Sequence, residues 1–337
     1  MKQIVLLISL ITIFSTSKGQ TADSILNKGK AKYELGDLKG AVLYFDNAIT
    51  IKPDFPEAYF YRGLAKRKLL NFNGALADYD KAIKFKPDYF LAYNIRGLAK
   101  HALKDYRGAI EDYNEAIKIN PDFFYAYISR ASSKDELDDN IGALYDLNKA
   151  IQLEPKESSA YFNRGNQKYK LDDYRGAIED YNKGIELNPN DPSLYSNRGK
   201  AKDKIEDYRG AIIDFNKGIE LNSYNDDNYT SRGKAKDALE DYRGAIADYN
   251  KAIEINPSDY ISFFNRGNAK RKLNDYRGAI EDYNRAIQID TKKPIAYVNR
   301  GLTKLILNEK NSGCLDLSKA GELGYPEAYD LIKKHCN

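Results

Sequence analysis

A small residue recurs every 34 positions along the chain, and this spacing limits the possible folds more than any other feature of the sequence. The series runs without an insertion through Gly29, Gly63, Gly97, Ala131, Gly165, Gly199, Gly233, Gly267 and Gly301. The segment DYRGAIEDYN also occurs three times, beginning at Asp105, Asp173 and Asp275. A period of this length is typical of stacked supersecondary units, because one such unit cannot bury its own apolar face. The sequence therefore predicts one elongated array of repeats.

Each repeat reads as two helices joined by a short turn. We number its positions 1 to 34, so that the repeats start near residues 22, 56, 90, 124, 158, 192, 226, 260 and 294. Position 4 is aromatic in eight repeats and position 14 is Leu or Ile in all nine, which is a helical spacing. Position 16 is Asp or Asn in eight repeats and can cap a second helix. Proline at position 32 of six repeats then ends that helix.

Two charged columns accompany this pattern. Position 7 is Arg in eight repeats, and position 23 is Asp in the same eight. Columns of opposite charge at fixed spacing predict a ladder of Arg–Asp pairs between the two helices of each repeat. The alternative is that these residues bind a ligand. Partly buried pairs contribute mainly to register, since desolvation offsets much of their attraction.

The repeats resemble the tetratricopeptide repeat, which has an aromatic residue at position 4, Gly or Ala at 8, Ala at 20 and 27, an aromatic residue at 24 and Pro at 32. The resemblance covers residues 20–325. It implies an all-α fold, a right-handed α-solenoid in which the first helices line a concave groove. Members of this family mostly bind peptides or protein surfaces in that groove.

Asparagine is frequent at groove positions 6 and 9. The candidate peptide-binding residues are Asn163, Asn166, Asn197, Asn265, Asn268 and Asn299. This series is similar to the asparagine ladder of O-linked N-acetylglucosamine transferase, which holds extended peptides by their backbone. A carboxamide suits that role because it offers both a donor and an acceptor. Alternatively, Asn is simply a polar surface residue that was copied when the repeats were duplicated.

Repeats two to four carry an apolar series at groove positions. It comprises Phe60, Tyr61, Leu64, Leu91, Ile95, Leu98, Tyr125 and Ile128. Exposed together, these side chains would form a patch that indicates a partner. Closure of the superhelix or the N-terminal segment would instead cover them. A groove that binds glycans is ranked last, because there is no Trp and few aromatic residues occupy groove positions.

The two ends of the chain differ from the repeats. Residues 1–19 have a basic start, an apolar run from Ile4 to Phe14 and a small polar stretch, the pattern of a secretory signal peptide. We therefore expect an exported protein, either periplasmic or secreted. Residues 326–337 read as an amphipathic helix that caps the array. Cys314 and Cys336 either form a disulfide in an oxidising compartment or remain free thiols.

The sequence contains no recognisable catalytic or metal-binding motif. The two histidines, His101 and His335, are expected at the surface, and two cysteines cannot close a zinc site alone. Without the leader the chain has 51 basic and 49 acidic residues, which argues against a nucleic-acid partner. We expect no cofactor, no enzymatic activity and no membrane span. The predicted function is a scaffold that binds an extended peptide or protein segment; the alternative is a structural subunit of a cell-envelope assembly.

Overall fold

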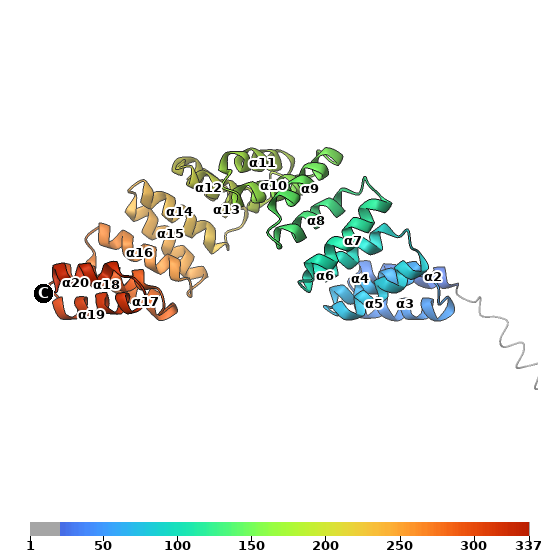
Figure 1. The fold of residues 1–337 in the computed structure, drawn as a ribbon, viewed down its shortest axis with the longest axis horizontal. Coiled ribbons are helices and arrows are strands. Elements are labelled where there is room, and N and C mark those ends of the chain that lie inside the picture. The colour runs from blue at the N-terminus through green and yellow to red at the C-terminus, as the bar shows by residue number, and fades with distance from the viewer. Residues whose placement is uncertain (1–20, 337) are drawn as a thin grey trace, which may run out of the picture. The chain divides into compact units, whose positions relative to one another are not determined.

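The computed structural model describes residues 21–336, and every regular element in that range is a helix. The predicted signal peptide, residues 1–19, lies outside the described residues. The chain divides into two compact units, Met1–Lys156 and Glu157–Asn337. In the first unit the described helices pair as α2 with α3, α4 with α5, α6 with α7 and α8 with α9 (Figure 1). Their bounds are α2 Ala22–Glu34, α3 Leu38–Ile51, α4 Pro56–Lys68, α5 Phe72–Phe85, α6 Phe90–Ala102, α7 Tyr106–Ile119, α8 Phe124–Asp135 and α9 Asn140–Leu153.

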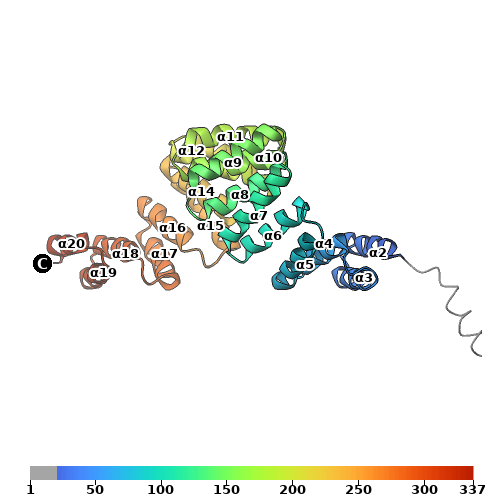
Figure 2. The same ribbon diagram turned by 45° about the vertical axis from the view of Figure 1, so that its right-hand side comes forward.

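The second unit repeats this arrangement and adds one helix. Its elements are α10 Ser158–Lys170, α11 Tyr174–Leu187, α12 Pro192–Lys204, α13 Tyr208–Leu221, α14 Asp226–Ala238, α15 Tyr242–Ile255, α16 Tyr260–Lys272, α17 Tyr276–Ile289, α18 Pro294–Ile306, α19 Lys310–Glu322 and α20 Glu327–His335. From α11 onward each helix packs on the one before it, and Figure 2 shows α18, α19 and α20 side by side. The predicted all-α solenoid of paired helices is confirmed.

One short turn links the two helices of every repeat. In repeat five the Asp173 N–H donates to the Lys168 carbonyl at 2.9 Å, and Asp172 adopts a left-handed φ of 61°. This is the hydrogen-bonding pattern of a Schellman motif, which satisfies carbonyls at a helix end. Asp173 then caps the next helix, because its Oδ1 accepts from the Gly176 N–H at 2.9 Å. The predicted caps at position 16 are confirmed in the eight repeats that have Asp or Asn there.

The core lies between neighbouring helices. In repeat five, Ala177 and Tyr181 at positions 20 and 24 are almost fully buried, and Ala201 of the next repeat packs in the same cluster. The alanines let the helix backbones approach closely, and the tyrosine ring fills the remaining space.

Small residues usually face each other between successive repeats, but two places in the second unit differ. Elsewhere in this unit, position 27 of the second helix is Ala and position 3 of the following helix is Ala or Ser. At the first departure Leu194 occupies position 3 and is fully buried against Gly184, where an added Cβ would lie 2.5 Å from Leu194 Cδ2. At the second, Asn228 is fully buried against Gly218. A larger side chain on one helix is thus matched by a glycine on its neighbour.

Asn228 is an unfavourable residue at its position, and Asn228→Leu is expected to stabilise the protein. Neither Asn228 Oδ1 nor Nδ2 has a hydrogen-bond partner among residues 21–336. An orphaned buried polar group costs about 1–3 kcal/mol. Leucine would remove that cost, and the Leu194–Gly184 contact shows that glycine leaves room for it. The check is the urea midpoint. Asn228→Ala, which leaves unfilled space, should gain less, and a midpoint below that of the wild type for Asn228→Leu would contradict the prediction.

The predicted Arg–Asp ladder is confirmed in all eight repeats that carry both residues. In each pair, Arg Nη2 lies 2.5–2.6 Å from Asp Oδ1. The pairs are Arg62–Asp78, Arg96–Asp112, Arg130–Asp146, Arg164–Asp180, Arg198–Asp214, Arg232–Asp248, Arg266–Asp282 and Arg300–Asp316. The contact is bidentate, because Arg Nε also donates to the carboxylate. These residues join the two helices of a repeat.

The ladder includes two further columns that the sequence analysis did not identify. Lys202, at position 11, lies 2.8 Å from Asp214 Oδ2, so that this carboxylate receives two cations. Arg198 Nη1 donates to Asn182 Oδ1 of the preceding repeat at 2.7 Å. The Arg198 guanidinium also stacks over the Tyr195 ring, 5.6 Å from its centroid. The same contact with Asp or Asn of the preceding repeat is made by Arg62, Arg96, Arg130, Arg232, Arg266 and Arg300, so these arginines also link neighbouring repeats.

The C-terminal segment packs on the last pair of helices. Leu331 and Ile332 of α20 lie against the core cluster of α18 and α19. Cys314 of α19 and Cys336 are joined in a disulfide, with their Cα atoms 5.9 Å apart. The bond ties the end of α20 to α19. No helix within residues 21–336 is both long enough and apolar enough to cross a bilayer.

Candidate functional site

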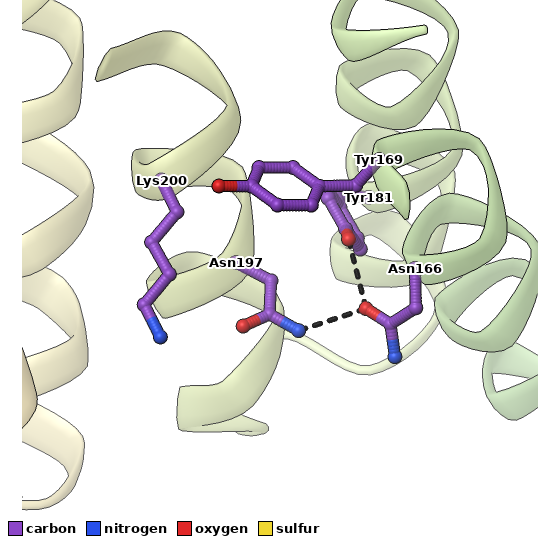
Figure 3. Close-up of a pocket in the computed structure, with 5 residues that line it drawn as sticks. All are labelled: Asn166, Tyr169, Tyr181, Asn197 and Lys200. Carbon is purple, nitrogen blue, oxygen red and sulfur yellow. Dashed lines mark hydrogen bonds between the residues drawn. The ribbon is translucent and has the colours of Figure 1, made fainter. Parts of the chain in front are cut away.

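Three polar side chains from α10, α11 and α12 form a hydrogen-bonded cluster in repeats five and six. Asn166 of α10 accepts two hydrogen bonds at its Oδ1, one from the Tyr181 hydroxyl of α11 and one from Asn197 Nδ2 of α12, each at 2.8 Å (Figure 3). Asn166 and Asn197 lie at positions 9 and 6 of successive first helices, 31 residues apart. We call these three residues the amide cluster.

The amide cluster leaves one donor and one acceptor available. Asn166 Nδ2 and Asn197 Oδ1 have no hydrogen bond to other residues in the described range. They border a cavity of about 230 Å³ that is also lined by Tyr169, Tyr181 and Lys200. Figure 3 shows the Tyr169 ring over the cluster and the Asn197 carbonyl oxygen on the Lys200 side. A donor and an acceptor beside an aromatic ring match the hydrogen-bonding groups of a peptide unit.

A second amide cluster lies three repeats further along the same unit. Asn268 Oδ1 accepts from the Tyr283 hydroxyl and from Asn299 Nδ2, again at 2.8 Å each. The two clusters therefore share their residue types, spacing and hydrogen bonds.

The remaining two candidate asparagines belong to neither cluster. Asn163 and Asn265 are half-buried at position 6, but the residues at position 9 of the preceding repeats are Ser132 and Lys234. Neither of these side chains is an amide, so the paired arrangement is absent there. Of the six asparagines, the structure brings four together as two pairs.

A second cavity of about 230 Å³ adjoins the first one and is charged. The two cavities share Tyr169 and Lys200, and the second extends to α14. Its other lining residues are Asp203, Lys204, Phe215, Asp227, Ser231 and Lys234. Lys200 Nζ pairs with Asp227 Oδ2 at 2.6 Å. Lys204 and Lys234 are exposed and form no ion pair within residues 21–336. We call this second cavity the lysine pocket.

Burial raises the pKa of Asp203 above its usual value, although Lys234 and Lys204 partly oppose the shift. The other titratable groups near it are Tyr169, Tyr249, Lys200 and Asp227. Its carboxylate makes no hydrogen bond or ion pair with the described part of the chain. Partial burial therefore makes the ionised form of Asp203 less favourable than it is in water.

Asp203→Asn is expected to raise the melting temperature at pH 7. A carboxyl group whose pKa is raised on folding destabilises the folded state above its folded pKa. This cost disappears once the pH falls below the unfolded value of about 3.9. The gain should be below about 1 kcal/mol at neutral pH, because the group is partly solvated, and should vanish near pH 3. Melting curves at the two pH values test this; an equal gain at both would contradict it.

The predicted apolar patch is mostly packed into the first unit. Phe60 is buried, and its ring centroid lies 4.9 Å from that of Tyr89. Half-buried members of the series are Tyr61, Leu64, Leu91, Ile95, Leu98 and Ile128. Tyr125 is 51% exposed. Four of the half-buried residues, Tyr61, Leu64, Leu91 and Ile95, pack against the core cluster that contains Phe60.

The expectation of a solvated His101 is wrong. Its side chain is half-buried, and its Nδ1 lies 2.8 Å from the Oγ of Ser133. Position 10 is Ala in most repeats, whereas repeat four has Ser133, which supplies the polar contact. Among residues 21–336 no group of His, Cys, Asp and Glu side chains is arranged to hold a metal ion.

Comparison with protein-family models gives several matches. A model described as TPR repeat matches residues 29–69, 165–205, 238–273 and 267–305. Models described as Tetratricopeptide repeat match residues 90–123 and 192–225. A search of curated proteins finds no match.

Several solved structures share the fold. A tetratricopeptide repeat protein from Parabacteroides merdae has a TM-score of 0.56 and 21% identity, over 74% of this chain and 99% of that one. The APC/C hetero-tetramer Cut9-Hcn1 has a TM-score of 0.57 and 15% identity, over 96% and 78% of the two chains. PilF of Pseudomonas aeruginosa has a TM-score of 0.54 and 16% identity, over 60% and 92%. At these identities the likeness concerns the fold alone.

Proposed function

We propose that this chain, which belongs to the tetratricopeptide-repeat family, is an interaction scaffold. It binds an extended peptide segment along the first helices of its second unit. The observation that carries the proposal is the amide cluster, whose free donor and acceptor border a cavity. The leader-like residues 1–19 support a site of action outside the cytoplasm.

Extended peptides need partners for their backbone groups. A peptide strand that lies in a groove loses water from its N–H and C=O groups, and each must then be hydrogen-bonded. Asn166 Nδ2 would donate to a peptide carbonyl, and Asn197 Oδ1 would accept from the next N–H. The Tyr181 hydroxyl holds Asn166 in place. Because the cluster is already formed, the partner bears most of the ordering entropy.

The test is selection of random 16-residue peptides on the purified protein, followed by calorimetry with a selected peptide. Asn166→Asp is the key variant, because it keeps the acceptor for Tyr181 and Asn197 but removes the amide donor. We expect it to weaken binding at least about tenfold, as a charged or unpaired group at the site would. Asn163→Asp in the same helix is the matched control and should bind normally. Equal affinities for Asn166→Asp and the wild type would refute the proposal.

The alternative, a structural subunit of an envelope assembly, has its own supporting observation. Ile141 and Tyr145 lie one turn apart on α9 and are 83% and 67% exposed. Two such side chains one turn apart offer an apolar surface that another protein could cover. Substituting both by Lys would block such an assembly and leave peptide binding in the second unit intact. Asn166→Asp would have the opposite effects, so the two variants together separate the functions.

A further inference from the structure

We propose that the lysine pocket binds an acidic side chain of the partner, next to the peptide group held by the amide cluster. This inference rests on the proposed function and specifies the sequence that the groove selects. It adds a charged binding site, formed by α12 and α14, to the backbone-binding site formed by α10 and α12.

The two cavities are close enough to be filled by one segment. Tyr169 and Lys200 line both, so that a ligand in the amide-cluster cavity lies against a wall of the lysine pocket. In an extended strand, successive side chains project in opposite directions and rise about 3.3 Å per residue. A side chain adjacent to the anchored peptide group can therefore enter the lysine pocket.

The charge balance of the lysine pocket favours an anion. It is lined by three lysines and two aspartates. Lys200 and Asp227 neutralise each other at 2.6 Å, which leaves Lys204 and Lys234 against Asp203. The Ser231 side chain offers a further hydroxyl donor. A carboxylate here would receive charge-assisted hydrogen bonds from two ammonium groups that have no other ion pair in the described chain.

The second amide cluster provides an internal comparison. Three repeats after Lys200, Asp203 and Lys204, the equivalent positions hold Leu302, Leu305 and Ile306. The hydrogen bonds of the two amide clusters are the same, but one adjoins lysines and the other adjoins aliphatic side chains. The amide clusters can thus bind the backbone of a peptide of any sequence, and the neighbouring side chains determine which peptide sequence is preferred.

The experiment uses the same random 16-residue peptide selection, with four proteins in parallel. On the wild type we expect Asp or Glu to be enriched at one position, and the affinity of such a peptide to fall as salt rises. Lys204→Glu/Lys234→Glu should reverse the enrichment to Lys or Arg. Lys217→Glu/Lys251→Glu is the control: it makes the same change in net charge on α13 and α15, outside the pocket, and should keep the acidic preference. Asp203→Asn removes a like charge and should tighten acidic peptides about fivefold, or about 1 kcal/mol.

The outcomes separate this inference from the proposed function. Peptides that bind in an Asn166-dependent manner but show no acidic preference would overturn the lysine pocket and leave the peptide groove standing. Loss of the acidic preference in the Lys217→Glu/Lys251→Glu control would show that net charge, not the pocket, attracts the peptide, and would also overturn it. If no peptide is selected, both proposals fail.

Discussion

Asp214→Ala should destabilise the second unit by about 3–5 kcal/mol, the usual cost of breaking a buried ion pair by removal of one partner. The Asp214 carboxylate is 1% exposed and accepts from Arg198 Nε at 2.9 Å and from Arg198 Nη2 at 2.5 Å. It also pairs with Lys202 at 2.8 Å. Removing it leaves two partly buried cations without a counter-charge. Hydrogen exchange, which resolves local opening, should show the loss in α12 and α13 first.

Two further variants separate the ion pair from the rest of the network. Asn182→Ala removes the exposed acceptor of Arg198 Nη1 and should cost less than about 1 kcal/mol, because that contact is solvated. Arg198→Met and Lys202→Met combined with Asp214→Leu should recover most of the loss, since apolar replacement of a whole buried ion network is often neutral. A triple variant as unstable as Asp214→Ala would mean that the carboxylate supports something other than the two cations.

Leu194→Ala should cost about 2–5 kcal/mol, the range for truncating a fully buried leucine. Gly184→Ala alone should also destabilise, by about 1–3 kcal/mol, because its Cβ would lie 2.5 Å from Leu194 Cδ2 in a packed interface. The two effects should not add. With Ala at 194, the new methyl group meets no clash and alanine gains about 1 kcal/mol of helix propensity over glycine.

The double variant Gly184→Ala/Leu194→Ala is therefore expected to be more stable than Leu194→Ala, although Gly184→Ala lowers the stability of the wild type. It recreates the arrangement found at Ala286 and Ala296, where both residues are fully buried. Urea unfolding of the wild type, the two single variants and the double variant gives the coupling energy between positions 184 and 194 directly. Additive losses would show that Gly184 and Leu194 do not constrain each other. Ala286→Gly serves as a control for propensity and should cost about 1 kcal/mol.

The fold and the ladder could be predicted from the sequence because each depends on columns of identical residues. With nine copies of one pattern, a misread position in one repeat is corrected by the same position in the other eight. Arg198 and Asp214 were paired because their types recur in step. The lysine column was missed, because Lys202 is one of many lysines on helices that are rich in charge.

The site was less predictable, since it depends on side chains that differ between repeats. Asparagines at positions 6 and 9 were predicted as one ladder, but the paired arrangement needs Asn at position 9 and Tyr at position 24 of the repeat before a position-6 Asn. Asn197 and Asn299 at position 6 meet both conditions, whereas Asn163 and Asn265 do not. His101 was misplaced for a similar reason, because its contact comes from Ser133 on another repeat.

The turn within each repeat has a consequence for how the array can evolve. Asp173 closes the end of α10 with its backbone N–H and opens α11 with its side chain, so a single residue serves two helices. One extra amino acid between them would separate these tasks and leave either a frayed end or an uncapped start. Insertions at this point should therefore destabilise the turn, in agreement with the unbroken 34-residue spacing from Gly29 to Gly301.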